Sequence, residues 1–379
     1  MVEPKVTPWE VSGDLNDEAY EKLVKKFGVS PITKDILKKI KDTAGSIHPF
    51  LAKGIFFAHR DLGEILDAYK KGEKFYLYTG RGPSGSMHIG HMLQFIFTKW
   101  LQDSFDADLV IQITDDEKKI VRDILPEKID EYVRDDVLNI LSLGFKPGKT
   151  HIIIDSLHAG VMYNHAVDVS KLITASTVKA VFGVKDSDSI GKFFFPSMQI
   201  VPAFLLSALR GDKMRCLIPY GIDQDPYFRV ARDVLPKLGY RKPAAIISKF
   251  IPGLKGPKNG KMSTSDPMSA VYLSDDETTV KKKLAKYAFS GGRDTLEEQR
   301  KYGAVPEVDF AFNTFMLLTE DSKEVDKVYD EYKSGKLLSG EMKQMAADKI
   351  NAFLSRIREA KKKIDVNDYL LDINKIHRV

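Results

Sequence analysis

Cysteine and long apolar runs are scarce in this chain of 379 residues, and each scarcity excludes a class of protein. The single cysteine, Cys216, excludes internal disulfides and any zinc site built from several cysteines. No run approaches the roughly 20 consecutive apolar residues of a membrane-spanning helix. The first residues contain no apolar stretch typical of a secretory signal. We therefore expect a cytoplasmic protein with no membrane association.

The charge balance excludes little. The chain carries 58 Lys and Arg residues against 53 Asp and Glu residues, a net charge of +5. Such a mildly basic protein can bind a polyanion, but a solvated lysine-rich face gives the same balance. The length is sufficient for two domains around a large core.

Five short runs rich in β-branched and aromatic residues alternate with helical patterns. They span residues 74–79, 109–114, 151–155, 215–219 and 244–248. Between the first two runs, Leu93, Phe97 and Trp100 belong to an apolar set with the spacing of one helix face. Strand, helix and strand in that space form a parallel βαβ unit. The sequence therefore predicts an α/β fold with a Rossmann-like, doubly wound parallel sheet.

The remaining segments suggest a division of the chain into domains. Residues 53–277 are expected to form the Rossmann-like catalytic domain, with a helical insertion at about 156–212 in the gap between the third and fourth runs. Residues 1–52 are expected to be an N-terminal extension that packs on this domain. Strand patterns end near residue 278, so residues 278–379 are expected to form an all-helical C-terminal domain.

A small-residue turn with two histidines follows the first strand. It begins at Thr79-Gly80-Arg81-Gly82 and ends at His88-Ile89-Gly90-His91, where a helix begins. Glycines let the backbone approach a nucleotide closely, and a helix N-terminus attracts phosphate. His88 and His91 share one helix face and can donate hydrogen bonds to phosphate oxygens. The alternative is an ordinary strand–turn–helix with incidental histidines.

A lysine loop follows the fifth strand. It runs from Gly253 to Ser265 and ends in Lys261-Met262-Ser263-Thr264-Ser265. Lysines among glycines and hydroxyls can close over a triphosphate and stabilise departing pyrophosphate. Taken singly, such a loop is more often a solvated surface loop.

Two further polar clusters follow the second and fourth strands. Gln112 and Glu117 fall in the first, and Asp223 and Gln224 fall in the second. Helix N-capping explains the first cluster equally well, and a proline-punctuated turn explains the second. However, the carboxyl ends of parallel strands meet at one edge, so four such clusters are expected to converge on one crevice.

The histidine turn and the lysine loop, in this order, resemble the signatures of class I aminoacyl-tRNA synthetases. Their surroundings are similar to tryptophanyl-tRNA synthetases of the eukaryotic and archaeal type. The supporting strings include Pro8-Trp9-Glu10-Val11, Thr114-Asp115-Asp116-Glu117-Lys118, Asp223-Gln224-Asp225-Pro226 and Ser290-Gly291-Gly292-Arg293-Asp294. The resemblance extends over nearly the whole chain. It departs from the family at Thr264, where many class I enzymes carry a second lysine, and at Gly221, where alanine is usual.

The resemblance implies a tryptophan–tRNA ligase that uses ATP, with Mg²⁺ carried by the nucleotide. It assigns the phosphate chemistry to His88, His91 and Lys261. Nucleotide-binding positions by the same likeness are Thr79, Gly80, Arg81, Gly82, Gly90, Met262, Ser263 and Ser265. Amino-acid-binding positions are Tyr78, Gln112, Glu117, Gln199, Asp223 and Gln224.

The resemblance also implies partners. They are L-tryptophan, tRNA(Trp), whose anticodon the helical domain would read, and a second copy of the chain. The apolar segment 196–206 would form the homodimer contact, unless it is ordinary core. Three alternatives remain: a tyrosyl-tRNA synthetase, a non-catalytic synthetase-derived binding protein, and a small nucleotidyltransferase.

Overall fold

The computed structural model describes residues 5–7, 11–12, 17–122, 124–256, 262 and 266–375. The lead-in Pro8-Trp9-Glu10 lies outside the described residues, as do Lys261, Ser263, Thr264 and Ser265. None of the helices among the described residues is both long enough and apolar enough to span a bilayer.

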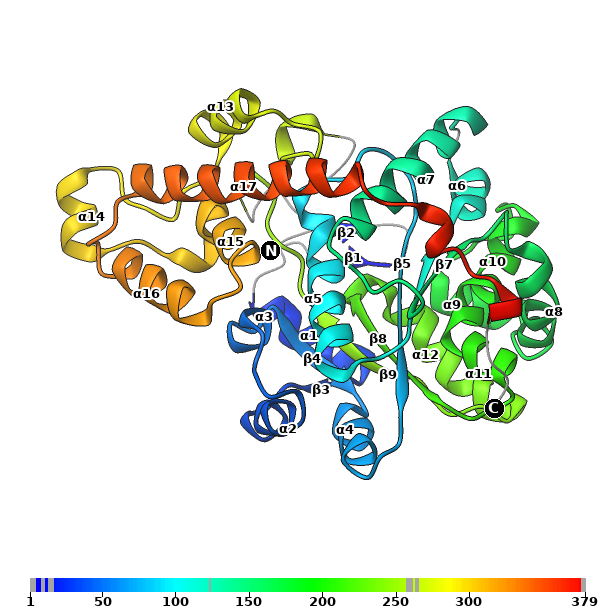
Figure 1. Cartoon of the computed structure of the whole chain (residues 1–379). Coiled ribbons are helices and arrows are strands. Elements are labelled where there is room, and N and C mark those ends of the chain that lie inside the picture. Colours follow the sequence, from blue (N-terminus) through cyan, green and yellow to red (C-terminus); the bar gives the residue numbers. More distant parts are fainter. Residues whose placement is uncertain are drawn as a thin grey trace.

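A seven-stranded mixed sheet organises the larger part of the molecule (Figure 1). Its strand order is β3-β4-β9-β8-β5-β6-β7. The five parallel strands are β5 (Phe75–Arg81), β6 (Leu109–Ile113), β7 (Thr150–Ile154), β8 (Arg215–Gly221) and β9 (Ala244–Ser248). They coincide with the five predicted runs, so the predicted fold class is confirmed.

Two antiparallel strands at one side of the sheet were not predicted. β4 (Phe56–Arg60) pairs with β9, and β3 (Ser30–Pro31) pairs with β4. Both precede the first predicted strand, and β3 is only two residues long, too short for an alternating pattern to be recognisable. Residues assigned to an N-terminal extension thus supply one edge of the sheet. The described residues also include a separate hairpin, β1 (Lys5–Val6) with β2 (Val11–Ser12).

Helices cover both faces of the sheet. Before and between the strands they are α1 (Asp17–Phe27), α2 (Lys34–Ala44), α3 (Pro49–Ala52), α4 (Leu62–Lys70), α5 (Ile89–Phe105), α6 (Asp115–Val121) and α7 (Pro126–Leu141). Between β7 and β8 lie α8 (Ala159–Ser170), α9 (Ala175–Phe182), α10 (Ile190–Ile200) and α11 (Leu205–Arg210), and between β8 and β9 lies α12 (Asp225–Val234). The region between β7 and β8 is therefore helical.

Strand residues alternate between two apolar clusters because successive side chains point to opposite faces of a sheet. Leu77 joins the cluster that includes α5 and α7, whereas Tyr76 and Tyr78 join the cluster that includes α8 and α10. The parallel strands are buried on both faces, which explains their nearly continuous apolar character.

The segment after β9 is helical. It contains α13 (Glu277–Tyr287), α14 (Leu296–Tyr302), α15 (Phe310–Leu317), α16 (Ser322–Lys333) and α17 (Ser339–Lys361). α17 crosses from these helices to the sheet region, where Lys361 Nζ donates to Asp135 of α7 at 2.7 Å (Figure 1). The chain then returns to the sheet edge, where Ile152 N donates to Tyr369 O at 2.7 Å.

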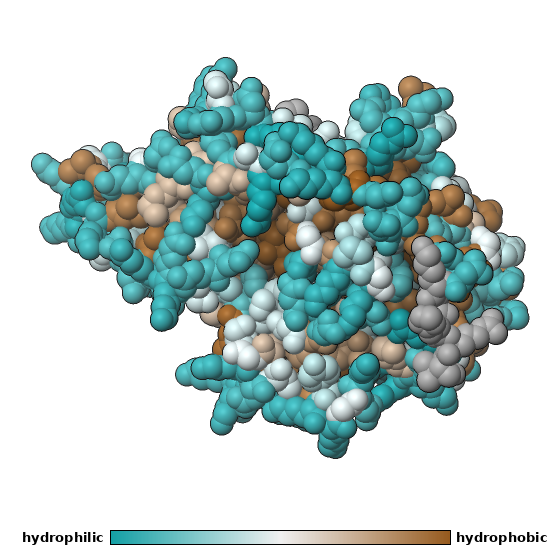
Figure 2. Space-filling view, viewed as in Figure 1, coloured by the Kyte–Doolittle hydropathy of each residue, from teal (hydrophilic) through white to brown (hydrophobic). Residues whose placement is uncertain are grey.

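The core is continuous between the sheet region and the C-terminal helices. One apolar cluster includes Leu93 of α5 together with Phe315 and Leu354 of α15 and α17. Most of the face shown in Figure 2 is hydrophilic, while hydrophobic residues gather below α17, where the two parts meet.

The predicted dimer segment requires a correction. Every residue from 196 to 206 is buried within the single chain. Phe204 and Leu206, for example, belong to the apolar cluster beneath the sheet. These side chains are not available to a partner, so the alternative of core packing is correct for this segment.

Candidate active site

A cavity of about 350 Å³ lies at the carboxyl edge of the parallel strands. It is bordered by the segments that follow β5, β6, β8 and β9, which is the convergence that the sequence predicts. Predicted site residues that line it are Tyr78, Thr79, Gly80, Arg81, Gly82, His88, Gly90, His91, Glu117, Gln199, Asp223, Gln224 and Met262. Gln112 is fully buried behind this lining. Lys261, Ser263 and Ser265 fall outside the described residues.

A buried hydroxyl group marks one end of the cavity. The Tyr78 hydroxyl donates to Gln112 Oε1 at 2.5 Å and accepts from Gln199 Nε2 at 3.0 Å. Tyr78 lies on β5, Gln112 on β6 and Gln199 on α10, so three elements fix this group. Burial raises the pKa of Tyr78 well above its ordinary value, which keeps the phenol neutral. This end of the cavity is suited to one polar atom within an aromatic surrounding.

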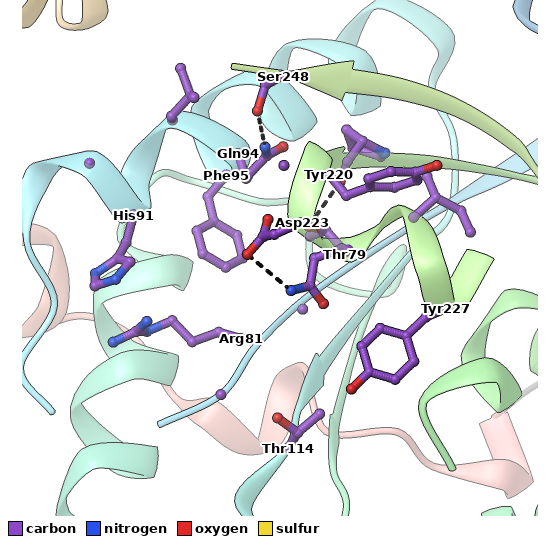
Figure 3. A pocket seen from close by; sticks show the side chains of 18 of the residues that line it. Thr79, Arg81, His91, Gln94, Phe95, Thr114, Tyr220, Asp223, Tyr227 and Ser248 are labelled. Carbon is purple, nitrogen blue, oxygen red and sulfur yellow. Dashed lines mark hydrogen bonds between the residues drawn. The ribbon is translucent and has the colours of Figure 1, made fainter. Parts of the chain in front are cut away.

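Carboxylate and amide groups stand beside it. Glu117 forms an ion pair with Lys118 at 2.5 Å and accepts from Thr114 Oγ1 at 3.2 Å. Gln224 Nε2 donates to Asp223 Oδ2 at 3.3 Å, one of the bonds drawn in Figure 3. These groups can bind the ammonium and carboxylate of an amino acid.

The two predicted histidines meet where α5 begins. Their rings stack with centroids 3.5 Å apart. The backbone N–H of His88 donates to His91 Nδ1 at 3.2 Å, so a neutral His91 carries its proton on Nε2. An imidazole N–H at a helix N-terminus is a donor suited to a phosphate oxygen.

The lysine loop and the segment that follows it lie against this histidine turn. Ile89 N donates to Val271 O at 3.0 Å, and Leu273 N donates to Met87 O at 2.9 Å. Met262, within the loop, is buried, and its sulfur would stand 3.1 Å from a Cβ added to Gly90. The two predicted signatures, which are far apart in sequence, are therefore in direct contact.

Two glycines of the turn lie close to neighbouring groups. A Cβ at Gly80 would lie 2.9 Å from the backbone oxygen of Gln112, and one at Gly82 would lie 2.3 Å from Lys118 Cε. The first contact is with rigid backbone, whereas the second is with a flexible side chain. A Cβ added to Gly221 would lie 2.9 Å from Asp223 Oδ1, which also belongs to a side chain.

Arg81 is held by a buried ion pair. Its Nε donates to Asp136 Oδ2 of α7 at 2.8 Å, and both side chains are less than 10% exposed. Burial raises the pKa of Asp136 to about 6, although the Arg81 charge opposes this shift. Figure 3 shows Arg81 and His91 on one side of the cavity and Tyr227 on the other.

Comparison with known proteins agrees with this geometry. The family described as tRNA synthetases class I (W and Y) matches residues 70–355. A protein of Saccharolobus solfataricus named tryptophan–tRNA ligase is 46% identical, over 96% of this chain and 95% of its own length. The chain belongs to the class I tRNA synthetases, within the tryptophan–tRNA ligase family.

Other relatives of this synthetase support the same grouping. The cytoplasmic tryptophan–tRNA ligase of Saccharomyces cerevisiae is 45% identical, over 96% of this chain and 87% of its own. The crystal structure of Plasmodium falciparum tryptophanyl-tRNA synthetase is 38% identical, with a TM-score of 0.87 over 95% of this chain and 99% of that one. The resemblance stated from the sequence is confirmed.

Several lining residues of the synthetase were missed from the sequence. They are Gln94, Phe95, Thr114, Phe195, Tyr227, Ser248, Lys249 and Phe250. Gln94 lies one helical turn after His91, and Ser248 ends the fifth predicted strand. Both could therefore have been predicted to line the cavity from their positions in the sequence. Gln94 Nε2 donates to Ser248 Oγ at 2.6 Å (Figure 3). Lys249 and Phe250 are supported from the N-terminal side, because Phe250 N donates to the Tyr20 hydroxyl at 2.9 Å.

Proposed function

We propose that this protein joins L-tryptophan to the 3′-terminal adenosine of tRNA(Trp), using ATP. The observation that carries the proposal is the arrangement of the cavity. One end presents the Tyr78 hydroxyl among aromatic rings, and the other presents His88 and His91 against Met262 of the lysine loop. Such a cavity suits an indole at one end and a triphosphate at the other.

In the first proposed step, the tryptophan carboxylate attacks the α-phosphorus of ATP. The bond to the β-phosphate breaks, and pyrophosphate leaves. The product, tryptophanyl-adenylate, then reacts with the 2′-hydroxyl of the terminal adenosine, and AMP leaves. Phosphoryl chemistry of this kind depends on positioning and charge stabilisation, so we assign no general base.

The nucleotide end supplies donors and close backbone approach. His91 Nε2–H, His88 and Lys261 are proposed to stabilise charge on the phosphates, with Arg81 at the rim. The remaining nucleotide contacts are proposed for Thr79, Gly80, Gly82, Gly90, Met262, Ser263 and Ser265. None of these residues has a carboxylate, so Mg²⁺ is proposed to arrive on the triphosphate and to keep its waters.

The amino-acid end supplies selectivity. Glu117, Gln112, Asp223 and Gln224 are proposed to handle the polar groups of tryptophan, and Tyr78 and Gln199 to surround the indole. A buried partner for the indole N–H rejects phenylalanine, because that partner would be left unpaired.

The wider assignments belong to the same proposal. The helices α13–α17 are proposed to bind the anticodon region, and the chain to act as a homodimer in the cytoplasm. Relatives from Saccharomyces cerevisiae and Arabidopsis thaliana are named cytoplasmic. Sedimentation of the purified protein tests the dimer, and a single monomeric species contradicts it.

ATP–pyrophosphate exchange with each proteinogenic amino acid in turn tests the activity. Exchange with tryptophan alone is expected. Exchange with tyrosine would preserve the reaction and overturn the substrate. Absence of exchange, from a folded protein that binds ATP, would indicate a non-catalytic binding protein.

A further inference from the structure

A buried carboxyl group lies behind the amino-acid end of the cavity. Asp155 directly follows β7 and is 1% exposed. Its backbone N–H donates to Ile113 O at 3.1 Å, which holds it beside the end of β6. Both of its carboxyl oxygens accept from Gln112 Nε2, each at 2.9 Å. None of the assignments above includes Asp155.

A second carboxyl group adjoins the first. Asp116, at the start of α6, is its acidic neighbour. Burial and the neighbouring Asp116 raise the pKa of Asp155 well above its ordinary value. A carboxyl group accepts hydrogen bonds in either protonation state, so Asp155 can accept from Gln112 with or without its proton.

The Gln112 amide links Asp155 to the Tyr78 hydroxyl at the cavity. Because Nε2 is engaged by Asp155, Oε1 faces Tyr78 and accepts the hydroxyl proton at 2.5 Å. A hydroxyl has one proton and two acceptor positions. Gln199 Nε2 uses one acceptor position, and the other is available to an N–H donor in the cavity. If the amide turned over, its NH₂ group would face the hydroxyl, and the Tyr78 proton would be released to other acceptors such as Gln199 O at 3.1 Å.

We propose that Asp155 is a positioning residue that fixes the amide of Gln112, and thereby makes the Tyr78 oxygen an acceptor for the N–H group of the substrate's side chain. The proposal rests on the proposed function and deepens it, because it assigns the donor–acceptor polarity of the pocket to a residue outside the lining. Asp155 touches neither substrate nor nucleotide in this account.

The test compares tryptophan with its benzothiophene analogue, in which sulfur replaces the indole N–H. The readout is the ratio of kcat/KM values for the two substrates in ATP–pyrophosphate exchange. In the wild-type protein we expect a preference for tryptophan of about 10- to 100-fold, because the analogue leaves a buried acceptor unpaired. Absence of exchange with tryptophan would refute the proposed function itself, which separates that failure from failure of this inference.

Two variants at Asp155 carry the test. Asp155→Ala is expected to reduce the preference at least fivefold, because Gln112 loses the partner that orients it. Asp155→Asn is expected to retain the wild-type preference, because its amide oxygen can still accept from Gln112 Nε2. A merely structural role would lower kcat/KM for both substrates and leave their ratio unchanged.

Asp115→Asn is the matched control. Asp115 is as buried as Asp155, but it accepts from Ser156 N and not from Gln112. The control is expected to retain the preference. If Asp155→Ala retains the wild-type ratio, or if Asp155→Asn or Asp115→Asn loses it to the same extent as alanine, the proposal is wrong. Gln112→Met, which breaks the same link from its other end, decides the matter if Asp155→Ala does not fold; retention of the preference there overturns the proposal.

Discussion

The two ends of the cavity are built differently. The amino-acid end is formed by side chains on β5, β6 and α10, and Tyr78, Gln112 and Gln199 are joined by hydrogen bonds in the core. The nucleotide end is formed where α5 begins and where the chain leaves β9, and it is held by backbone hydrogen bonds such as Ile89 N to Val271 O.

The difference separates two tasks. Recognition of one side chain needs polar atoms at fixed positions, which rigid, buried elements provide. Stabilisation of a triphosphate needs donors that surround developing charge, which a helix N-terminus and a loop can supply. Substitutions at the two ends should therefore affect different kinetic constants, and the following variants test that expectation.

The largest effect is expected for Lys261→Ala. Loss of a positive charge beside the departing pyrophosphate should lower the exchange rate by about 100- to 1,000-fold. Tryptophan affinity, measured by calorimetry, should remain nearly unchanged, because the amino-acid end is intact. Lys255→Ala is a matched control, since it removes a lysine of the same loop that pairs with Asp266 at 2.8 Å. Near-normal exchange in Lys261→Ala would remove this residue from the mechanism.

Tyr78→Phe should produce the opposite pattern. Removal of the hydroxyl leaves Gln112 Oε1 without its donor and the indole N–H without its acceptor, so tryptophan affinity should fall by about 10- to 100-fold. The KM for ATP should change little. Tyr76→Phe is the control on the same strand, because it removes an equally buried hydroxyl that donates to Pro202 O instead. Equal loss of tryptophan affinity in both variants would contradict the role assigned to Tyr78.

Gly90→Ala tests the contact between the two signatures. The added Cβ would stand 3.1 Å from Met262 Sδ and 3.2 Å from His88 Nδ1, tighter than ordinary contact. We expect the KM for ATP to rise about tenfold, because overpacking displaces one of these groups. Gly160→Ala is the control, since Gly160 holds the equivalent second position of α8 and an added Cβ there meets nothing within 4 Å.

A double-mutant cycle sharpens the assignment. If the Cβ of Gly90→Ala strains Met262, the second substitution Met262→Ala should recover part of the lost ATP affinity. Strictly additive effects would show that the two signatures are not coupled through this contact.

Some parts of the fold and of the site were easier to predict from the sequence than others. All five parallel strands and the helix after β5 were recognisable from apolar patterns, because buried parallel strands are nearly continuously hydrophobic. The histidine turn was recognisable from its order relative to the lysine loop. In contrast, β3 and β4 were missed, because both precede the alternating strand–helix pattern and β3 has only two residues.

Contacts between distant segments could not be predicted. The apolar segment 196–206 has the same composition whether it faces the core or a second subunit, and only the packing distinguishes the two. The pairing of Arg81 with Asp136 likewise joins residues 55 positions apart, and it depends on how α7 lies against the end of β5. In the sequence, Asp155 was notable only because it follows a predicted strand. Its bond to Gln112 depends on β6 and β7 being neighbours in the sheet.

The smallest effect concerns Asp136, which pairs with Arg81 at the nucleotide end. Its pKa is raised from 3.8 to about 6 by burial, so at pH 5 the folded protein retains a proton that the unfolded chain has lost. This contribution to stability is complete below pH 4 and declines as the pH rises through 6.

The variant Asp136→Asn tests this expectation, because its side chain cannot ionise and its stability should not show this decline with pH. Between pH 5 and pH 6, the free energy of unfolding from urea titrations should fall by about 1 kcal/mol more for the wild-type protein than for Asp136→Asn. If the free energy of unfolding changes equally with pH in the two proteins, Asp136 is ionised throughout this range. The attraction of Arg81 would then outweigh the effect of burial on the pKa of Asp136.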